Sequence, residues 1–383
     1  MATLYDPRNR LAPRPPMGWN SYNPFGGMHG LPADADPALP GGVALSEKLI
    51  LETADSLVSR GLRDSGYVYL NIDDRWQDPC QPRDESGRLR WDERRFPHGI
   101  PWVAEFVHER GLKFGLYTVA NVYACGGEEG CGPCGAPATG SLGHERVDAD
   151  SFAEWGVDFL KIDWCGVDEA RNRGRAADVF ACWNEAIAST GRDMIMSAST
   201  WGEEDEPAWA PRLTHMWRTT ADLLPTWDSI VAVAQATADP RWSAVSGPKS
   251  GWNDPDFLQV GHPALTYAES KSHLVMWAML SAPLLAGNDI RTASLDIVEL
   301  LRNDTVLALD QDGSPSATLT TLDGEWDVWD RRLASGHVAR AVINLADSPR
   351  RVCGSIDLPG DHDVFGTSVL EPLAPHDVVL FVT

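Results

Sequence analysis

Apolar, strand-like runs alternate with helix-like stretches from about residue 16 to residue 300 of this chain. Such alternation is typical of parallel strands joined by crossover helices, and eight units favour a closed (β/α)8 TIM barrel over an open sheet. The expected strands are Met17–Trp19, Tyr67–Ile72, Lys113–Tyr117, Val157–Ile162, Met194–Met196, His215–Arg218, Ala244–Val245 and Pro283–Ala286. The expected helices are Ser46–Arg60, Pro101–Arg110, Asp148–Trp155, Ala176–Ser189, Thr226–Ala238, Tyr267–Leu280 and Leu295–Leu301.

A different pattern begins after Asp310, where short alternating segments surround the hairpin turn signal Asp323-Gly324. The strands expected in this part are Thr318–Leu322, Glu325–Trp329, Val338–Ile343, Arg351–Ile356 and Asp377–Val382. The length of 383 residues suits a barrel of about 250 residues with an additional module. We therefore expect a catalytic barrel over residues 1–305 and a C-terminal antiparallel β-sandwich over residues 306–383.

Charge and hydropathy exclude two classes of partner. The formal net charge is −23, with 55 acidic and 32 basic residues, so the chain repels nucleic acid and anionic membrane surfaces. No stretch approaches the roughly 18 apolar residues of a membrane span. The N-terminal residues lack the apolar segment of a secretory signal, so we expect a cytoplasmic protein, although a chain whose signal had been removed would look the same. The sequence does not determine the oligomeric state.

The seven cysteines leave the state of one loop open. An odd number means that at least one thiol stays unpaired within the monomer. Cys125, Cys131 and Cys134 lie close in sequence, and with Cys165 they suit a zinc site, a loop held by disulfides, or free thiols. The ten histidines form no obvious ligand cluster. We therefore expect neither a metal ion nor a cofactor.

Two aspartates close short, strand-like runs: Asp163 ends residues 157–163, and Asp222 ends residues 217–222. Active sites of TIM barrels lie at the C-terminal ends of the strands. Hydrolysis of a glycosidic bond with retention needs two carboxyl groups, a nucleophile and an acid that protonates the leaving oxygen. Lys161, two residues before Asp163 on the same strand face, should lower the pKa of that carboxyl. An acidic rim around Asp222 favours the protonated acid, although Arg218 opposes this.

The adjacent pair Asp73 and Asp74 follows the second expected strand. Each carboxylate can accept hydrogen bonds from two hydroxyls, which suits a sugar ligand. Binding of a divalent cation and helix capping are the alternative roles for this pair.

Seven motifs occur in order between residues 17 and 256: MGWNSY (17–22), NIDDRW (71–76), RFPHGI (95–100), GLKFGLYT (111–118), FAEWGVDFLKID (152–163), WRTTAD (217–222) and GWNDPD (251–256). Together they resemble glycoside hydrolase family 27, which includes α-galactosidases and α-N-acetylgalactosaminidases. The family pairs a (β/α)8 barrel with a C-terminal antiparallel β-domain, as expected above from the residue pattern.

This resemblance implies a role for each matched residue. Asp163 would be the nucleophile, Asp222 the acid/base, and Asp73 and Asp74 would bind the O4 and O6 hydroxyls of the sugar. Other matched pocket residues are Trp19, Tyr117, Lys161, Arg218 and Asp256. Cys125 and Cys165 match a pair that forms a disulfide beside the sugar in family members.

The chain departs from the family pattern at three cysteine positions. Arg75 stands where many members have a cysteine after the acidic pair, and Ala198 and Thr214 occupy the positions of a second disulfide. Fewer bridges agree with a reducing compartment.

The loop after the fifth strand faces the 2-position of the sugar in this family. Ser199 and Gly202 match the two small residues that leave room for an acetamido group in α-N-acetylgalactosaminidases. Trp201 or Glu203, in the same loop, could instead fold into this space and favour plain galactose.

We therefore expect a retaining, exo-acting glycoside hydrolase that removes terminal α-linked galactose-type sugars from an oligosaccharide or glycoconjugate. Within the family, α-N-acetylgalactosaminidase, β-L-arabinopyranosidase and isomaltodextranase are alternatives. Outside it, the alternatives are a non-catalytic carbohydrate-binding protein and a metal-dependent hydrolase.

Overall fold

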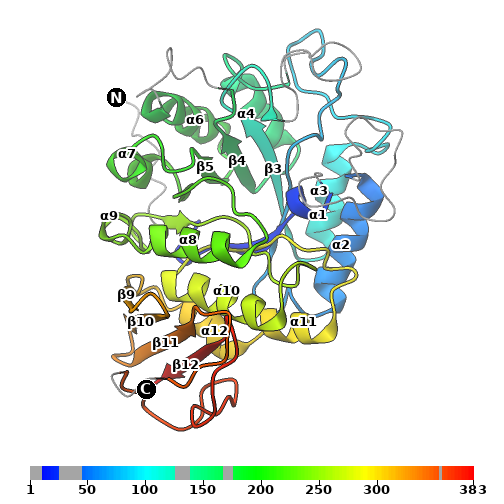
Figure 1. Ribbon diagram of the computed structural model, residues 1–383. Helices are drawn as coiled ribbons and strands as arrows, with labels where there is room; N and C mark the ends of the chain where they lie inside the picture. Colours follow the sequence, from blue (N-terminus) through cyan, green and yellow to red (C-terminus); the bar gives the residue numbers. More distant parts are fainter. Residues whose placement is uncertain (1–10, 26–44, 126–138, 167–175, 353–355) are drawn as a thin grey trace.

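The computed structural model describes residues 11–25, 45–125, 139–166, 176–352 and 356–383 (Figure 1). Eight parallel strands form one curled sheet in the order β7-β6-β5-β4-β3-β2-β1-β8, which confirms the predicted barrel. A parallel bridge between Leu258 and Ala286 joins the segment after β7 to β8. The strands are β1 (Met17–Asn20), β2 (Tyr69–Ile72), β3 (Lys113–Val119), β4 (Phe159–Asp163), β5 (Ile195–Ser199), β6 (Met216–Arg218), β7 (Trp252–Asp254) and β8 (Leu284–Ala286).

Helices cover the outside of this sheet (Figure 1). α2 buries Leu49, Ile50, Ala54 and Leu57, the helical spacing of an apolar face. None of the helices in the described part of the chain is long and apolar enough to cross a membrane. The helices are α1 (Tyr22–Phe25), α2 (Glu47–Ser59), α3 (Ile100–Glu109), α4 (Glu145–Glu154), α6 (Ala176–Thr190), α7 (Glu206–Leu213), α8 (Trp227–Thr237), α9 (Pro240–Ser243), α10 (Tyr267–Leu280), α11 (Leu295–Leu301) and α12 (Asp304–Asp310).

The seventh strand lies at Trp252–Asp254, and the prediction at Ala244–Val245 is wrong. Ala244 is instead the C-cap of the short helix α9, and the amide of Val245 donates to the Trp242 carbonyl. β7 has only three residues, and two of them are polar. It therefore lacks the apolar run by which the other strands were located.

The C-terminal residues form a separate antiparallel sheet in the order β12-β11-β10-β9, which confirms the predicted change of architecture. One face, with Trp329, Ala341 and Leu380, joins the main hydrophobic core, whereas Trp326 and Phe381 on the other face form a smaller one. The strands are β9 (Thr318–Leu322), β10 (Trp326–Arg332), β11 (Val338–Asn344) and β12 (Val378–Val382).

The strand expected over residues 351–356 is wrong for its described residues, because Arg351, Val352 and Ile356 belong to no strand. Residues 353–355 lie outside the described ranges. Val352 and Ile356 pack on the smaller core of the C-terminal sheet, so their apolar side chains cover the sheet without extending it. The domain boundary expected between residues 305 and 306 falls within α12 and stays a prediction.

Candidate active site

A pocket opens at the C-terminal ends of the barrel strands. Both aspartates singled out from the sequence, Asp163 and Asp222, border it. Every other predicted site residue borders it too, except Trp19, Ser199 and Gly202. The lining residues are Tyr22, Asn23, Asp73, Asp74, Tyr117, Cys125, Lys161, Asp163, Cys165, Trp201, Arg218, Asp222, Leu223, Asp256 and Phe257.

Lys161 lies between two carboxylates at the base of the pocket. Its Nζ is 3.0 Å from Oδ2 of Asp73 and 3.6 Å from Oδ2 of Asp163. The alternation along β4 explains this position, because Lys161 and Asp163 point into the barrel while Leu160 and Ile162 join the outer core. The Lys161 ammonium also lies 5.1 Å from the ring centroid of Phe257, within cation–π range.

Burial and charge act in opposite directions on the pair of Lys161 and Asp163. Burial lowers the pKa of Lys161, but the carboxylates of Asp73 and Asp163 outweigh it and the net direction is upward. Burial raises the pKa of Asp163, with Lys161 as the strongest opposing influence. We expected Lys161 to bring the pKa of Asp163 below its ordinary value. That expectation is wrong in its net direction, because β4 withdraws the carboxyl almost completely from water.

A second buried cation, Arg218, joins two other carboxylates. Its Nη2 is 3.2 Å from Oδ1 of Asp222 and 3.1 Å from Oδ2 of Asp256. Asp256 also accepts from the amides of Leu223 and Phe257, at 2.8 Å each. Burial, reinforced by Asp222 and Asp254, raises the pKa of Asp256 to about 6, although Arg218 opposes this. The side chain of Asp222 is 48% exposed, so it lies at the open side of the pocket.

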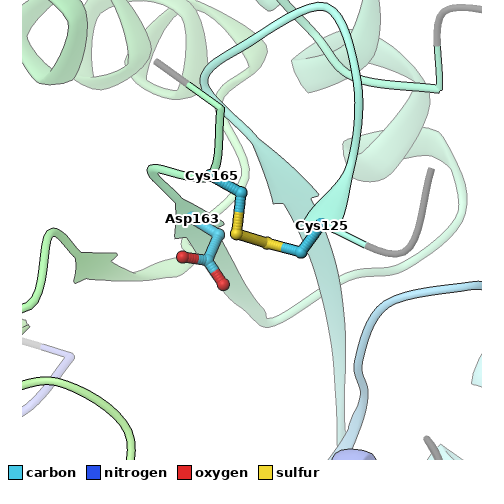
Figure 2. Close-up of side chains that lie close together, drawn as sticks. All are labelled: Cys125, Asp163 and Cys165. Atoms are coloured by element: carbon cyan, nitrogen blue, oxygen red, sulfur yellow. A yellow bond between two sulfur atoms is a disulfide. The ribbon is translucent and has the colours of Figure 1, made fainter. Parts of the chain in front are cut away.

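Cys125 and Cys165 form a disulfide beside Asp163, with their Cα atoms 5.3 Å apart (Figure 2). The hydroxyl of Tyr117 donates to Sγ of Cys125 at 3.0 Å. The ligand atoms of these two cysteines and Asp163 lie within 4.8 Å of one another, which is close enough for a metal site. Zinc, however, binds thiolates, and the disulfide removes both. Cys131 and Cys134, the other members of the proposed zinc loop, lie outside the described residues.

Trp19 does not border the pocket, and Tyr22 does. Trp19 is fully buried in the outer core, and its indole N–H donates to the carbonyl of Asn288 at 2.8 Å. The inward position at the end of β1 belongs to Asn20, which donates to Oδ2 of Asp73 at 2.7 Å. The sequence indicated the outward position of Trp19, because Trp19 and the apolar Met17 are two residues apart and so point to the same side of β1. Burial, followed by the charge of Asp73, raises the pKa of Tyr22 to about 12.

The loop after β5 presents Trp201 to the pocket, rather than Ser199 or Gly202. Ser199 ends β5 and is buried. Gly202 has a positive φ of 77°, and a Cβ there would lie 2.2 Å from the Thr219 carbonyl oxygen. Gly202 is therefore required by its backbone and its close neighbour, and its small size does not open the pocket.

Three lining residues had no signal in the sequence pattern. Asn23 belongs to α1, a helix of four residues, whereas Leu223 and Phe257 directly follow the acidic residues Asp222 and Asp256. A neighbour in sequence enters the pocket only when the turn directs it there, and local patterns do not specify this.

Comparison with known proteins gives this site its context. A family model described as "Alpha galactosidase A" matches residues 14–312, which include both predicted catalytic aspartates. The chain belongs to glycoside hydrolase family 27. As a member of this family it is a glycoside hydrolase.

Several family members are similar over most of their length. Alpha-galactosidase 3 of Arabidopsis thaliana is 36% identical over 375 residues, which cover 97% of this chain and 78% of the relative. Alpha-galactosidase of Coffea arabica is 39% identical, covering 89% and 81%. The crystal structure of alpha-galactosidase I from Mortierella vinacea has a TM-score of 0.79 at 27% identity and covers 98% of both chains.

Proposed function

We propose that this family 27 hydrolase is a retaining α-galactosidase. A carboxylate oxygen of Asp163 attacks the anomeric carbon while Asp222 transfers a proton to the leaving oxygen, which breaks the glycosidic bond. Asp222 then removes a proton from water, and the attack of this water releases the sugar from Asp163. The proposal rests on one observation: the two carboxyl groups, from the end of β4 and the segment after β6, border the same pocket.

The environments of the two aspartates suit these different roles. Asp163 is buried beside the Lys161 ammonium, and its Oδ1 accepts from the Trp164 amide at 2.9 Å. Both contacts stabilise the ionised nucleophile. Asp222 lies at the open side of the pocket, where a leaving group extends toward solvent. This arrangement supports removal of a terminal sugar from an oligosaccharide or glycoconjugate.

Trp201 supports plain galactose as the sugar. By family resemblance the loop after β5 faces the 2-position, and in this chain it contributes an indole side chain to the pocket wall. A bulky ring at that place leaves room for a hydroxyl but not for an acetamido group. Asp73 and Asp74, on another side of the pocket, are proposed to bind the O4 and O6 hydroxyls.

The direct test is the initial rate on p-nitrophenyl α-D-galactopyranoside and on its 2-acetamido analogue. We expect the plain galactoside to be cleaved at least tenfold faster. Faster cleavage of the acetamido substrate would mean that the enzyme is an α-N-acetylgalactosaminidase and that Trp201 moves away when the sugar binds. Cleavage of neither substrate would contradict the proposal.

Substitution of the two aspartates separates their roles. Asp163→Asn should abolish turnover and leave galactose binding within a few-fold of wild type, because an amide cannot attack the anomeric carbon. Asp222→Asn should slow substrates with poor leaving groups by roughly 100-fold or more, and activated nitrophenyl substrates much less, because a stable phenolate needs no proton. Equal losses on both kinds of substrate would exclude Asp222 as the acid.

A further inference from the structure

One buried carboxyl group behind the pocket has no part in the chemistry proposed above. Glu206, the first residue of α7, has no solvent-exposed surface, whereas Glu203 and Asp205 in the same acidic run are exposed. A buried carboxyl group is costly unless its oxygens find partners. In the described part of the chain no cation pairs with Glu206, and its Oε2 has no hydrogen-bond partner. The hydrogen bonds of Oε1 must therefore account for its position.

The two shorter hydrogen bonds of Glu206 go to the residues that flank Trp201. Its Oε1 accepts from the hydroxyl of Thr200 at 2.5 Å and from the amide of Gly202 at 3.0 Å. The amide of Glu204 adds a longer bond of 3.4 Å to the same atom. One oxygen of Glu206 therefore fixes the chain on both sides of the side chain that enters the pocket.

The backbone of Trp201 needs such support. Its φ is 59°, in the left-handed region that is unfavourable for a residue with a large side chain. Conformations of this kind persist when the surrounding structure holds them. On the opposite side, Gly202 packs against the carbonyl of Thr219, which directly follows Arg218 of the pocket. The loop is thus held between Glu206 and the end of β6.

We propose that Glu206 is a positioning residue for sugar selectivity: it holds Trp201 at the pocket wall, where the indole excludes a 2-acetamido group. This inference rests on the proposed function, since it assumes that the wall formed by Trp201 faces the 2-position. Glu206 does not border the pocket and acts only through the loop.

The test compares Glu206→Ala with Glu206→Gln, using Glu203→Gln as a control in the same loop. Loss of the acceptor in Glu206→Ala should raise the KM for the galactoside about tenfold. It should also lower the ratio of kcat/KM between the galactoside and its acetamido analogue about tenfold, while kcat changes less. Glu206→Gln should keep near-wild-type selectivity because its amide oxygen accepts the same bonds. Glu203→Gln should match wild type.

Two further measurements keep the outcome decisive. If Glu206→Ala does not fold, Thr200→Val removes one of the two flanking bonds and should shift selectivity in the same direction by a smaller factor. Calorimetric binding of galactose and N-acetylgalactosamine measures the preference without turnover.

A wild-type enzyme that prefers galactose in binding but cleaves neither substrate would refute the proposed function alone. A folded Glu206→Ala variant with wild-type preference, or a Glu206→Gln variant as defective as Glu206→Ala, would overturn the positioning role.

Discussion

Each buried cation of the pocket is shared between two carboxylates. Lys161 contacts Asp73 and Asp163, and Arg218 contacts Asp222 and Asp256. When Asp163 forms a bond to the sugar it loses its charge, and Lys161 still keeps Asp73 as a partner. The charge balance therefore changes gradually along the proposed reaction, without leaving an isolated buried ammonium.

Because Tyr22 rather than Trp19 borders the pocket, we expect substitution of Tyr22 to weaken substrate binding and substitution of Trp19 to reduce stability. Tyr22→Ala should raise the KM for galactosides about tenfold, equivalent to about 1.4 kcal/mol of binding, because it removes part of the pocket wall. Trp19→Phe leaves the Asn288 carbonyl without its donor and should cost about 1–3 kcal/mol of stability. Michaelis constants and urea unfolding distinguish the two. A rise in KM for Trp19→Phe at wild-type stability would contradict this assignment.

Protonation of the buried His215 should lower the free energy of unfolding of the protein in acid. Burial lowers the pKa of His215 to about 4, and its Nδ1 accepts from the Met196 amide at 2.9 Å. Because the unfolded pKa is about 6.5, this stability is present above pH 6.5 and is lost as pH falls toward 4, by roughly 3 kcal/mol. His215→Asn keeps an acceptor and removes the titration. Its unfolding free energy should therefore fall less steeply across that range, and an unchanged slope would exclude His215 as the cause.

At the scale of elements, the strand ends determine where the nucleophile lies, and the turns that follow the strands determine the shape of the pocket wall. Asp163 is the last residue of β4, but Trp201 and Asp256 lie in turns with positive φ values of 59° and 87°. A left-handed residue reverses the chain sharply, and in both of these turns the side chain of the left-handed residue itself borders the pocket. The pocket wall therefore depends on a few strained turns held by nearby contacts.

The disulfide between Cys125 and Cys165 connects the segment after β3 to the segment after β4 across 40 residues of sequence. The double variant Cys125→Ser/Cys165→Ser should lose about 4 kcal/mol of stability in the chain-entropy model. Its KM should also rise, because the bridge and the hydroxyl of Tyr117 support one side of the pocket. Thermal unfolding and kinetics with and without a dithiol reductant measure both effects. Cys182→Ser, at an exposed free cysteine, is the control, and an equal effect there would exclude the bridge.

At the scale of the whole molecule, α10 connects the barrel with the C-terminal sheet (Figure 1). Twelve of its residues, from Glu269 to Leu280, are buried, and its apolar content is not confined to one face. Arg331 of β10 crosses this interface and donates to the carbonyls of Ala278 in α10 and Leu309 in α12, each at 2.8 Å. Such contacts make the two parts a single packed body.

Arg331→Met should therefore weaken the whole molecule rather than the sheet alone. The change removes the hydrogen bonds that the Arg331 guanidinium donates to the carbonyls of Ala278, Leu309 and Ser314, and it should cost roughly 3 kcal/mol or more. Calorimetry should show a lower melting temperature for Arg331→Met. Arg332→Met is the matched control, because this neighbouring side chain is exposed. Equal melting temperatures for the two variants would show that Arg331 does not stabilise the interface.

Local periodicity was sufficient for the architecture. Seven of the eight barrel strands could be located because strands covered by helices carry apolar runs, and β7 could not because its three residues include Asn253 and Asp254. The position of Asp163 was predictable for a related reason, since it closes β4 and the parallel strands of a barrel all end at one face. The strand-like run expected over residues 217–222 is wrong beyond Arg218, where β6 ends, and Asp222 follows in the turn after that strand.

The sequence alone determined the barrel, the change to antiparallel strands after Asp310 and the acidic face on which the pocket lies. Only the tertiary structure decided which neighbours enter that pocket: Tyr22 rather than Trp19, and Trp201 rather than Ser199 or Gly202. The physical reason is the range of the interactions involved. The periodicity of a strand depends on residues that are adjacent in sequence. The direction of a side chain in a turn depends instead on contacts with other segments, such as those that hold Gly202 between Glu206 and Thr219.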